Sequence, residues 1–476
     1  MASDRARSAT SDLLVAVARG DGPLQRQVED QLRAAIREGR LVAGERLPSS
    51  RVLAADLGVS RGVVSDAYGQ LAAEGWLVMA PRSGPRVAAA PRAAAAAPAA
   101  RPAPAPVRYD LRPGRPDLAR FPRADWLRSL AAAVRGAGGA ELDYPPPAGS
   151  PRLRAVLAAY RGRVRGTLAS ADDVIVCAGA AQAFITVADA LGRGATVAVE
   201  DPGHAEIRAL LARRGLAVAP VAVDEDGLVV RALPDDARAV FVTPAHQFPT
   251  GVVLSPERRA ELLRWAETRG ALIVEDDYDA EYRYDRAPVG ALQGLRPDLV
   301  IHVGSVSKTL APALRLGWLI APEAWRERLL DARGALDHGL PALEQHALAD
   351  FIERGAYDRH LRRSGRAYRR RRDALVASLA TALPQATVSG AAAGLHVAVH
   401  IPDADEAALV AACRTRGLAL DGAARHGGGI AAPAARPAGA ARHGCAAPAG
   451  ATLLISFAAV PDAAAGHVAE LIASAL

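Results

Sequence analysis

The chain has 476 residues, of which half are hydrophobic, and a formal net charge of +7. This length allows two or three domains with a buried core. No apolar run approaches the ~18 to 20 residues that cross a bilayer, and no signal-peptide pattern opens the chain. The three cysteines are odd in number and form no Cys-x-x-Cys pair, which argues against a disulfide framework and a structural metal site. We expect a cytoplasmic protein that does not enter a membrane.

The chain is predicted to begin with a helical unit. A first helix lies between Pro23 and Gly39, because apolar residues recur at every fourth position of this stretch: Leu24, Val28, Leu32 and Ile36. Two shorter helices are predicted next, one over 50–57 and one from the capping residue Ser60 to Gly75. The inward face of the second of these is predicted to carry Val63, Ala67 and Leu71. Two short helices joined by a tight turn are typical of a helix-turn-helix.

A strand, a turn and a second strand are predicted after these helices, in "WLVMAPRSGPRVAA" at 76–89. This β-wing carries a cation at its tip. Arg61 lies in the first turn of its helix, where the macrodipole disfavours a positive charge by up to ~1 kcal/mol. A phosphate group at this helix end would remove the conflict. Residues 1–107 also hold 14 arginines against 10 acidic residues, a weak indication of DNA.

The stretch "EGRLVAGERLPSSRVLAADLGVSRGVVSDAYGQLAAEGWL" resembles the winged helix-turn-helix of the GntR family of bacterial regulators. The match covers roughly residues 20–88 and implies a DNA-binding domain over 1–87. The resemblance implies that six residues face double-stranded DNA: Arg51, Ser60, Arg61, Tyr68, Arg82 and Ser83. Gly62 departs from the family, whose members usually carry a polar side chain at this position.

A linker and an α/β unit are predicted to follow. Residues 88–107 are rich in alanine and proline, which favours a semi-rigid spacer. From 108 to 476, strand-like and helical runs alternate, which predicts a mainly parallel sheet wrapped by helices, with ligands at the carboxyl ends of the strands. We expect a large subdomain at about 150–345 and a small subdomain at about 346–476. The Gly-, Ala- and Pro-rich segment 423–450 is predicted to be a mobile surface loop.

Lys308 is the only lysine among 58 basic residues. Arginine can replace lysine as a charge or a phosphate contact, but it does not supply a primary amine. A desolvated lysine can attack a carbonyl and form a Schiff base. Chance retention of one lysine is the alternative explanation.

Polar residues that would complement a carbonyl cofactor follow several strands. Asp276 and Tyr278 come directly after one strand, and an aspartate beside a pyridine nitrogen keeps that nitrogen protonated. Arg315 and two hydroxyls near Lys308 could hold a phosphate, as could the helix start at 179–181. These features together indicate pyridoxal 5′-phosphate. The acidic strand end alone would equally suit magnesium or a solvated cluster.

Residues 108–476 resemble the fold type I pyridoxal-phosphate enzymes, the aspartate aminotransferase group. The whole chain, with "VTPAHQFPTGVVLS", "LIVEDDYDAEYRY" and "VGSVSKTLAPALRLGWL", resembles the MocR subfamily of GntR regulators. The resemblance implies a Schiff base at Lys308, Asp276 at the ring nitrogen and Tyr278 at the ring hydroxyl. It implies a phosphate site made by Gly179, Ala180, Ala181, Ser305, Ser307 and Arg315. Tyr144 would reach the phosphate of a neighbouring subunit, which implies a homodimer.

Some positions depart from this family. His204 stands where relatives carry a tyrosine over the cofactor ring, and alanines at 180 and 181 replace polar side chains. Leu454 stands where aminotransferases carry an arginine for the substrate carboxylate; Arg442 is a candidate replacement. We therefore expect a regulator that senses an amine, an amino acid or the cofactor itself. The alternatives are an aminotransferase with an ancillary DNA-binding domain and a scaffold without cofactor. The basic stretch 360–372 is interpreted as a solvated helical face, with a second DNA contact as the alternative.

Overall fold

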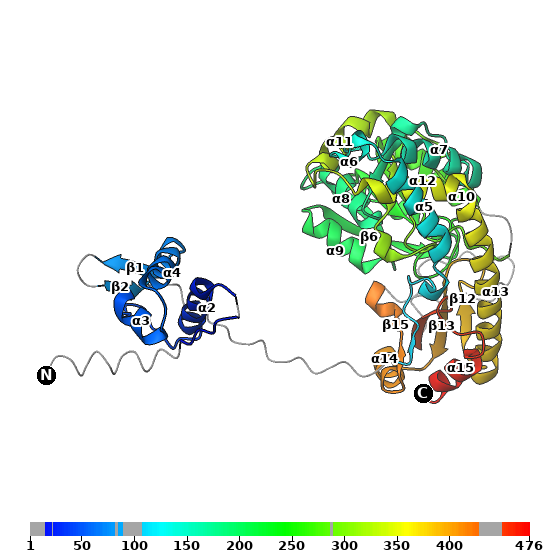
Figure 1. Ribbon diagram of the computed structural model, residues 1–476. Helices are drawn as coiled ribbons and strands as arrows, with labels where there is room; N and C mark the ends of the chain where they lie inside the picture. Colours follow the sequence, from blue (N-terminus) through cyan, green and yellow to red (C-terminus); the bar gives the residue numbers. More distant parts are fainter. Residues whose placement is uncertain (1–14, 21, 81–83, 89–106, 286–288, 428–449) are drawn as a thin grey trace. The chain divides into compact units, whose positions relative to one another are not determined.

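The computed structural model describes residues 15–20, 22–80, 84–88, 107–285, 289–427 and 450–476. The chain divides into two compact units, Met1–Ala103 and Pro104–Leu476. The first is the blue part of the ribbon in Figure 1, and the second runs from cyan to red. Within the described residues, every helix is too short or too polar to cross a membrane.

The described residues of the first unit form three helices and a two-stranded antiparallel ribbon, which confirms the predicted winged helix-turn-helix. The elements are α2 (Leu24–Arg37), α3 (Ser50–Leu57), α4 (Arg61–Ala73), β1 (Leu77–Ala80) and β2 (Gly84–Val87). Ser49 and Ser60 cap α3 and α4, because their hydroxyl oxygens accept hydrogen bonds from the backbone N–H groups of Val52 (3.3 Å) and Val63 (3.5 Å). Gly58 ends α3 in the left-handed conformation, with φ of 63°.

The inward face of α4 differs from the prediction at one position. Val64 is fully buried, whereas Val63 is only partly buried, so the expected inward position of Val63 is wrong. The buried stripe of this helix is Val64, Ala67, Tyr68 and Leu71. This spacing of three, one and three residues follows the 3.6-residue helical period more closely than a strict spacing of four. As a consequence, Tyr68 joins the core.

The second unit is built on an eight-stranded sheet with the order β4-β11-β10-β9-β8-β5-β6-β7. The five strands from β10 to β6 are parallel, and β4 runs in the same direction because β11 lies antiparallel between β4 and β10. This confirms the predicted, mainly parallel sheet. The strands are β4 (Val174–Cys177), β5 (Thr196–Asp201), β6 (Ala217–Asp224), β7 (Gly227–Leu228), β8 (Ala239–Val242), β9 (Leu272–Asp276), β10 (Val300–Ser305) and β11 (Gly317–Ile320).

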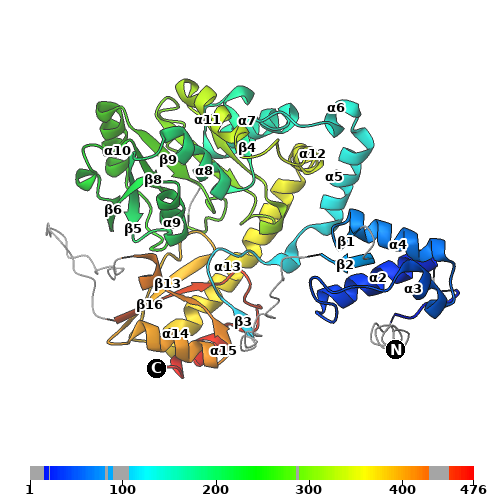
Figure 2. The ribbon, with the colours of Figure 1, turned by 90° about the vertical axis from the view of Figure 1, so that its left-hand side faces the viewer.

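Helices cover both faces of this sheet (Figure 2). Alternate residues of β9 enter different cores: Val274 packs in the core that contains α8 and α11 side chains, and Ile273 packs in the core that contains α10 side chains. A third core joins α5, α7 and α12 to the β4 end of the sheet. The helices are α5 (Arg123–Gly136), α6 (Gly139–Leu142), α7 (Pro151–Arg165), α8 (Ala180–Leu191), α9 (Ala205–Arg213), α10 (Pro256–Arg269), α11 (Arg326–Gly334) and α12 (Ala342–Glu353).

A smaller antiparallel sheet, β12-β13-β16-β15, forms the rest of the unit. Its strands are β12 (Thr387–Ser389), β13 (His396–Pro402), β15 (Asp421–Gly422) and β16 (Gly450–Ser456), and they pack with α14 (Glu406–Thr415) and α15 (Ala465–Ala473). Helix α13 (Ala356–Ala382) serves both parts of the unit, since Tyr357 lies in the core beside α7 and Leu375 lies in the core of the small sheet. Figure 2 shows this long helix running from one part to the other. Strand β3 (Tyr109–Asp110) pairs with β14 (Leu418–Ala419).

The segment predicted to be a mobile loop begins with ordered structure. Residues Ala423–His426 form a 3-10 helix, η6, and His426 is only 3% exposed. The carbonyl of His426 accepts a hydrogen bond of 3.0 Å from the N–H of Gly203 in the β5–α9 connection. The prediction is therefore wrong for 423–426, and residues 428–449 lie outside the described part of the chain.

Candidate functional site

The predicted DNA-facing residues are distributed over the helix-turn-helix of the first unit. Arg51 in α3 and Arg61 at the first position of α4 are exposed, and neither side chain has a partner among the described residues. The hydroxyl of Ser60 is used by its own helix as a cap. A Cβ added to Gly62 would meet only the Ser60 hydroxyl oxygen, at 3.8 Å, so the surface here is open. Both arginines are free to contact phosphate.

Tyr68 does not face solvent, which contradicts the expectation that it contacts DNA. Its side chain is 1% exposed, and its hydroxyl donates a hydrogen bond of 3.0 Å to the carbonyl of Pro48. Burial raises the pKa of this phenol above its ordinary value. The residue thus fastens the loop before α3 to the core. Arg82 and Ser83, predicted at the wing tip, lie outside the described residues.

The second unit gathers the predicted cofactor residues at one edge of its large sheet. Strands β4, β9 and β10 run in the same direction, so their carboxyl ends meet at this edge. Asp276 is the last residue of β9, Ser305 is the last of β10, and Gly179 follows β4. Lys308 comes three residues after β10. Ligands of such sheets bind at this position.

The Lys308 amine is held by a residue that was not predicted. Its Nζ donates a hydrogen bond of 2.6 Å to the carbonyl of Gly114, in the segment after β3. Burial lowers the pKa of Lys308, while the charges of Asp276 and Asp279 oppose this effect. Gly114 has φ of 84°, which favours glycine, and a Cβ on it would lie 2.8 Å from Nζ and displace the amine from this position. A lowered pKa leaves a larger fraction of the amine unprotonated, which is the form that attacks a carbonyl.

The carboxyl group of Asp276 is buried at the end of β9. The residue is 8% exposed, and its Oδ1 is buried with no hydrogen bond among the described residues. Burial, and then the charge of Asp277, raise its pKa to about 8. Asp276 lines a small cavity together with His204 and Glu200. A protonated ring nitrogen would satisfy the carboxyl oxygen and stabilise its charge, so this position fits a pyridine ring.

The expected phosphate site has the required glycine and cation. Gly179 precedes α8 with φ of 80°, and a Cβ on it would lie 3.2 Å from Nη1 of Arg315. Arg315 is exposed and donates to the carbonyl of Ala178. The N–H of Gly179 donates a hydrogen bond of 2.8 Å to the carbonyl of Cys177. Ala180 and Ala181 are the first two residues of α8. The N–H groups of a first helical turn have no carbonyl partner in a preceding turn. These groups form a cradle for an anion.

Ser305 and Ser307 lie beside this cradle on the segment that leads to Lys308. Ser305 is 8% exposed, and its hydroxyl oxygen accepts a hydrogen bond of 3.4 Å from the N–H of Ser307. Tyr144, expected to serve a neighbouring subunit, is 81% exposed and contacts His338 edge-on, with ring centroids 6.0 Å apart.

The aromatic side chains of the site contact one another. The ring of His204 stacks on Phe248, with centroids 3.8 Å apart and an interplanar angle of 5°. The hydroxyl of Tyr278 lies 2.9 Å from Nδ1 of His246. Burial raises the pKa of the Tyr278 hydroxyl well above its ordinary value. Burial also lowers the pKa of His204, so its imidazole is neutral near pH 7. A neutral flat ring of this kind can stack on a cofactor ring.

The wall contributed by the small sheet is apolar. Leu454 is fully buried in a cluster of five residues: Phe248, Tyr278, Ala398, Ala423 and Leu454. His396 and His426 border this cluster, with ring centroids 5.4 Å and 4.9 Å from Phe248. Burial lowers the pKa of His396 to about 3, and both ring nitrogens of His426 are buried without partners among the described residues. Arg442 lies outside the described residues.

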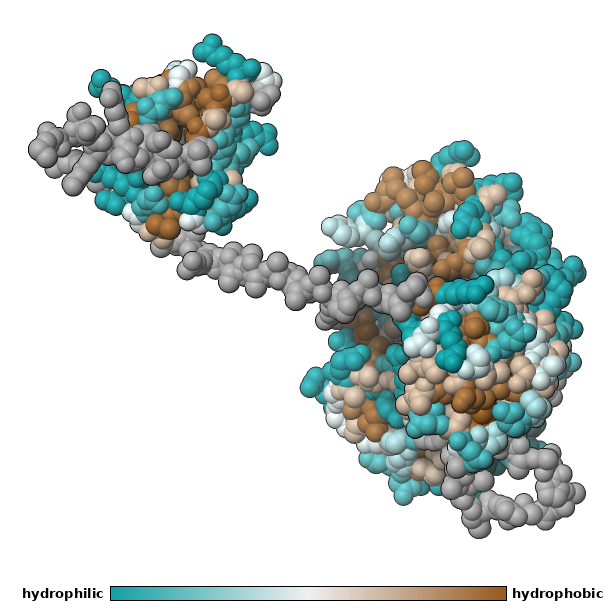
Figure 3. Space-filling view, turned by 90° about the horizontal axis from the view of Figure 1, so that it is seen from below, coloured by the Kyte–Doolittle hydropathy of each residue, from teal (hydrophilic) through white to brown (hydrophobic). Residues whose placement is uncertain are grey.

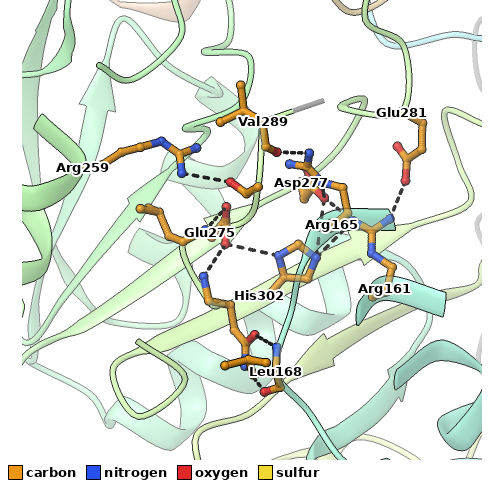
Figure 4. A network of polar contacts seen from close by, with 12 residues as sticks. Arg161, Arg165, Leu168, Arg259, Glu275, Asp277, Glu281, Val289 and His302 are labelled. Atoms are coloured by element: carbon orange, nitrogen blue, oxygen red, sulfur yellow. Dashed lines mark hydrogen bonds and ion pairs between the residues drawn. The ribbon is translucent and has the colours of Figure 1, made fainter. Parts of the chain in front are cut away.

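A buried charge network supports the other side of β9 (Figure 4). Asp277 accepts hydrogen bonds from Arg165 (2.8 and 2.9 Å) and from Arg161. Nδ1 of His302 lies 3.3 Å from Oε2 of Glu275. Burial alone would raise the pKa of Asp277, but Arg165, Arg161 and His302 lower it below the ordinary value. Reasoning from the sequence missed this network. The sequence did contain a signal for it in "VEDDYD". Successive side chains of a strand point to opposite faces of a sheet, so Glu275 and Asp277 point away from Asp276.

Family comparisons cover both units. Residues 24–87 match the family described as "Bacterial regulatory proteins, gntR family", and residues 117–425 match "Aminotransferase class I and II". The "HTH-type pyridoxine biosynthesis transcriptional regulator PdxR" of Corynebacterium glutamicum is 36% identical over 410 residues, which is 85% of this chain and 89% of that protein. The "Probable rhizopine catabolism regulatory protein MocR" of Rhizobium meliloti is 35% identical over 383 residues, 75% of this chain and 77% of that protein.

Solved structures resemble the second unit. The multiple substrate aminotransferase of Thermococcus profundus superposes with a TM-score of 0.68 at 22% identity, covering 78% of this chain and 91% of that chain. This likeness confirms the fold type I architecture. The GntR match and the regulator relatives extend over the DNA-binding unit as well. The chain therefore belongs to the MocR subfamily of GntR transcriptional regulators, DNA-binding proteins that join a winged helix-turn-helix to an aminotransferase-like domain.

Proposed function

We propose that the aminotransferase-like domain binds pyridoxal 5′-phosphate at Lys308 and that the state of this site controls DNA binding by the first unit. The observation that carries the proposal is the buried Oδ1 of Asp276, which has no hydrogen-bond partner in the described part of the chain and lies in a cavity that His204 also lines. A buried polar atom without a partner costs about 1–3 kcal/mol, which a ligand can recover. The chain's only amine side chain lies on the adjacent strand end.

When bound, the cofactor supplies an aldehyde that reacts with amines and a ring that withdraws electrons. The residues present fit it in distinct roles. Lys308 provides a partly desolvated amine, and Asp276 would hold a proton on the ring nitrogen. Arg315 and the start of α8 would hold the phosphate, His204 would cover the ring, and Tyr278 would offer its hydroxyl to the ring oxygen.

Regulation requires that the occupied and empty sites favour different arrangements of the protein. An effector amine that displaces Lys308, or the cofactor itself, would supply this difference. The relative named for pyridoxine biosynthesis favours the cofactor as effector. An aminotransferase with an ancillary DNA-binding domain remains the rival, and the apolar surroundings of Leu454 argue against it, because turnover of an amino acid requires an oriented carboxylate.

A homodimer is part of the proposal. Large apolar side chains are exposed on α5, α6 and the following loop: Leu127 (65%), Val134 (55%), Leu142 (66%) and Tyr144 (81%). Figure 3 shows apolar surface of this kind, in brown, on the larger unit. Soluble monomers rarely expose large contiguous apolar patches. A second copy of the chain would cover these side chains.

Fluorescence anisotropy with duplex DNA from the region upstream of the gene tests the regulatory part. The apo protein, the protein saturated with pyridoxal phosphate, and the saturated protein with added amines are compared. We expect at least one state to differ about fivefold or more in DNA affinity, a coupling of ~1 kcal/mol. Lys308→Arg serves as the control, since it retains the charge but not the amine. Equal DNA affinity in all states would refute the sensing role while leaving cofactor binding intact.

A further inference from the structure

The basic stretch 360–372 falls into two halves in the structure. The arginines of its second half have partners within the chain. Arg371 donates to Asp117 and Asp462, both at 2.8 Å, and Arg369 donates to the carbonyl of Tyr284 at 2.6 Å. These contacts explain why the second half of the stretch is basic.

The arginines of the first half of the stretch have fewer acidic partners. Arg363 is 3.7 Å from the carboxylate of Asp125, which Arg128 also approaches, at 3.4 Å. Arg362 and Arg366 are exposed and have no partner among the described residues. An excess of positive charge therefore surrounds this part of α13.

A polar cavity of about 280 Å³ opens beside these residues. It lies between α13 and the 3-10 helix η1 (Leu118–Arg120), and its lining is Ala119, Arg120, His360, Arg363 and Ser364. The side chain of Arg120 has no ion-pair partner among the described residues. The lining thus contains two guanidinium groups and an imidazole but no carboxylate.

We propose that this cavity binds a small anion carrying a phosphate group and that the bound anion restrains the segment with Lys308. Guanidinium groups bind phosphate oxygens in a bidentate manner, and two of them converge here on one cavity. The volume of about 280 Å³ lies just below the ~300–1,000 Å³ of small-molecule sites, which favours phosphate or a small phosphate monoester over a larger ligand. The cavity is separate from the Arg315 cradle.

Two contacts connect the cavity wall to Lys308. His360 is 4% exposed, and its Nε2 donates a hydrogen bond of 2.7 Å to the carbonyl of Thr309, the residue after Lys308. One turn earlier on α13, the Tyr357 hydroxyl donates a bond of 2.8 Å to Oγ1 of Thr309. Burial lowers the pKa of His360. The hydrogen bond to Thr309 and the charge of Asp125 oppose this effect, and the charges of Arg363 and Arg120 add to it. A bound anion would offset those two charges and strengthen the hydrogen bond to Thr309.

Calorimetric titration with inorganic phosphate tests the site. All proteins carry Arg315→Ala, so that phosphate does not bind at the expected cofactor cradle and the result does not depend on the proposed function. We expect Arg120→Ala combined with Arg363→Ala to weaken phosphate binding at least tenfold. Arg362→Ala combined with Arg366→Ala is the matched control, because it also removes two positive charges, from exposed positions of α13 outside the cavity, and its phosphate affinity should stay within about twofold of the parent. Equal losses in the two proteins would overturn the proposal.

Hydrogen exchange tests the connection to Lys308. In the parent protein, phosphate should slow amide exchange over residues 305–311, and in the double variant it should not. Unchanged exchange in the parent would overturn the proposed restraint. Pyridoxine 5′-phosphate, which has no aldehyde, is titrated in parallel: binding that is tighter than that of phosphate and is weakened in the double variant assigns the cavity to a phosphorylated metabolite, and cavity-dependent binding equal to that of phosphate assigns it to the free anion. Loss of DNA affinity without loss of phosphate affinity would instead make the cavity a DNA contact.

Discussion

Asp276 and Asp277 are neighbours in the sequence, both are buried, and they have opposite surroundings. Asp277 is 3% exposed and receives hydrogen bonds from two arginines behind the sheet. Asp276 is 8% exposed, and its Oδ1 has no partner among the described residues. The pKa of Asp277 is consequently lowered by Arg165 and Arg161 against the effect of burial, whereas burial raises that of Asp276 to about 8.

This difference separates a carboxylate whose partners lie within the protein from one whose oxygen is available to a ligand. Buried polar groups are normally paired by hydrogen bonds. A buried group whose partners lie within the protein therefore supports the fold, whereas a buried group without such a partner is available for binding. The same contrast exists in the first unit. Tyr68 has a hydroxyl paired with Pro48, while Arg61, on the same helix, has no partner among the described residues. Each of the following changes tests one side of this comparison.

The largest expected loss of stability is in the buried charge network around Asp277. Arg161 is fully buried and contacts Asp277, Glu281 and His302. Arg161→Leu leaves two carboxylates short of a partner, and breaking such a buried pair costs about 3–5 kcal/mol. The matched control is Arg152→Leu, on the same helix, where the pair with Glu353 is 45% and 42% exposed and is worth at most ~1 kcal/mol. Urea denaturation measures both; similar losses would show that the network does not support the fold.

Asp276→Asn should instead increase the stability of the apo protein at neutral pH. The folded pKa of about 8 lies above the unfolded value of about 3.9, so the folded protein retains a proton that the unfolded chain releases. Wild-type stability therefore falls as the pH rises between these values, and the variant should not show this part of the fall. Its affinity for pyridoxal phosphate should drop about 10- to 100-fold, from the loss of ~1.5–3 kcal/mol in one charge-assisted hydrogen bond. A parallel pH profile for the two proteins would contradict the raised pKa.

The smallest effects are expected in the first unit. Tyr68→Phe removes the hydrogen bond to Pro48 and should cost about 0.5–1.5 kcal/mol of stability without changing DNA affinity. Arg61→Ala should do the reverse, with stability within ~0.5 kcal/mol of wild type and the salt slope of DNA binding reduced by about 1. Thermal denaturation and anisotropy over a range of salt concentrations measure the two properties. Weaker DNA binding by Tyr68→Phe would restore the original expectation for this residue.

Local patterns were sufficient for much of the fold. The helix-turn-helix and the mainly parallel sheet agree with the structure, because caps, turns and apolar periodicity are properties of short segments. Lys308 and Asp276 were identifiable by their residue types after strands. The bond from Lys308 to Gly114 and the pairing of Arg161 with Asp277 join residues 194 and 116 positions apart, and no local pattern encodes them. His426 was missed because the composition of its segment indicated a loop.

Borohydride reduction of the full-length protein saturated with pyridoxal phosphate, followed by peptide mapping, tests the central claim most directly. Reduction makes the bond between an amine and the cofactor permanent, and the chain offers one lysine. The account predicts a single modified peptide containing Lys308, and none in Lys308→Arg. Absence of this adduct, or the same labelling of both proteins, would contradict it.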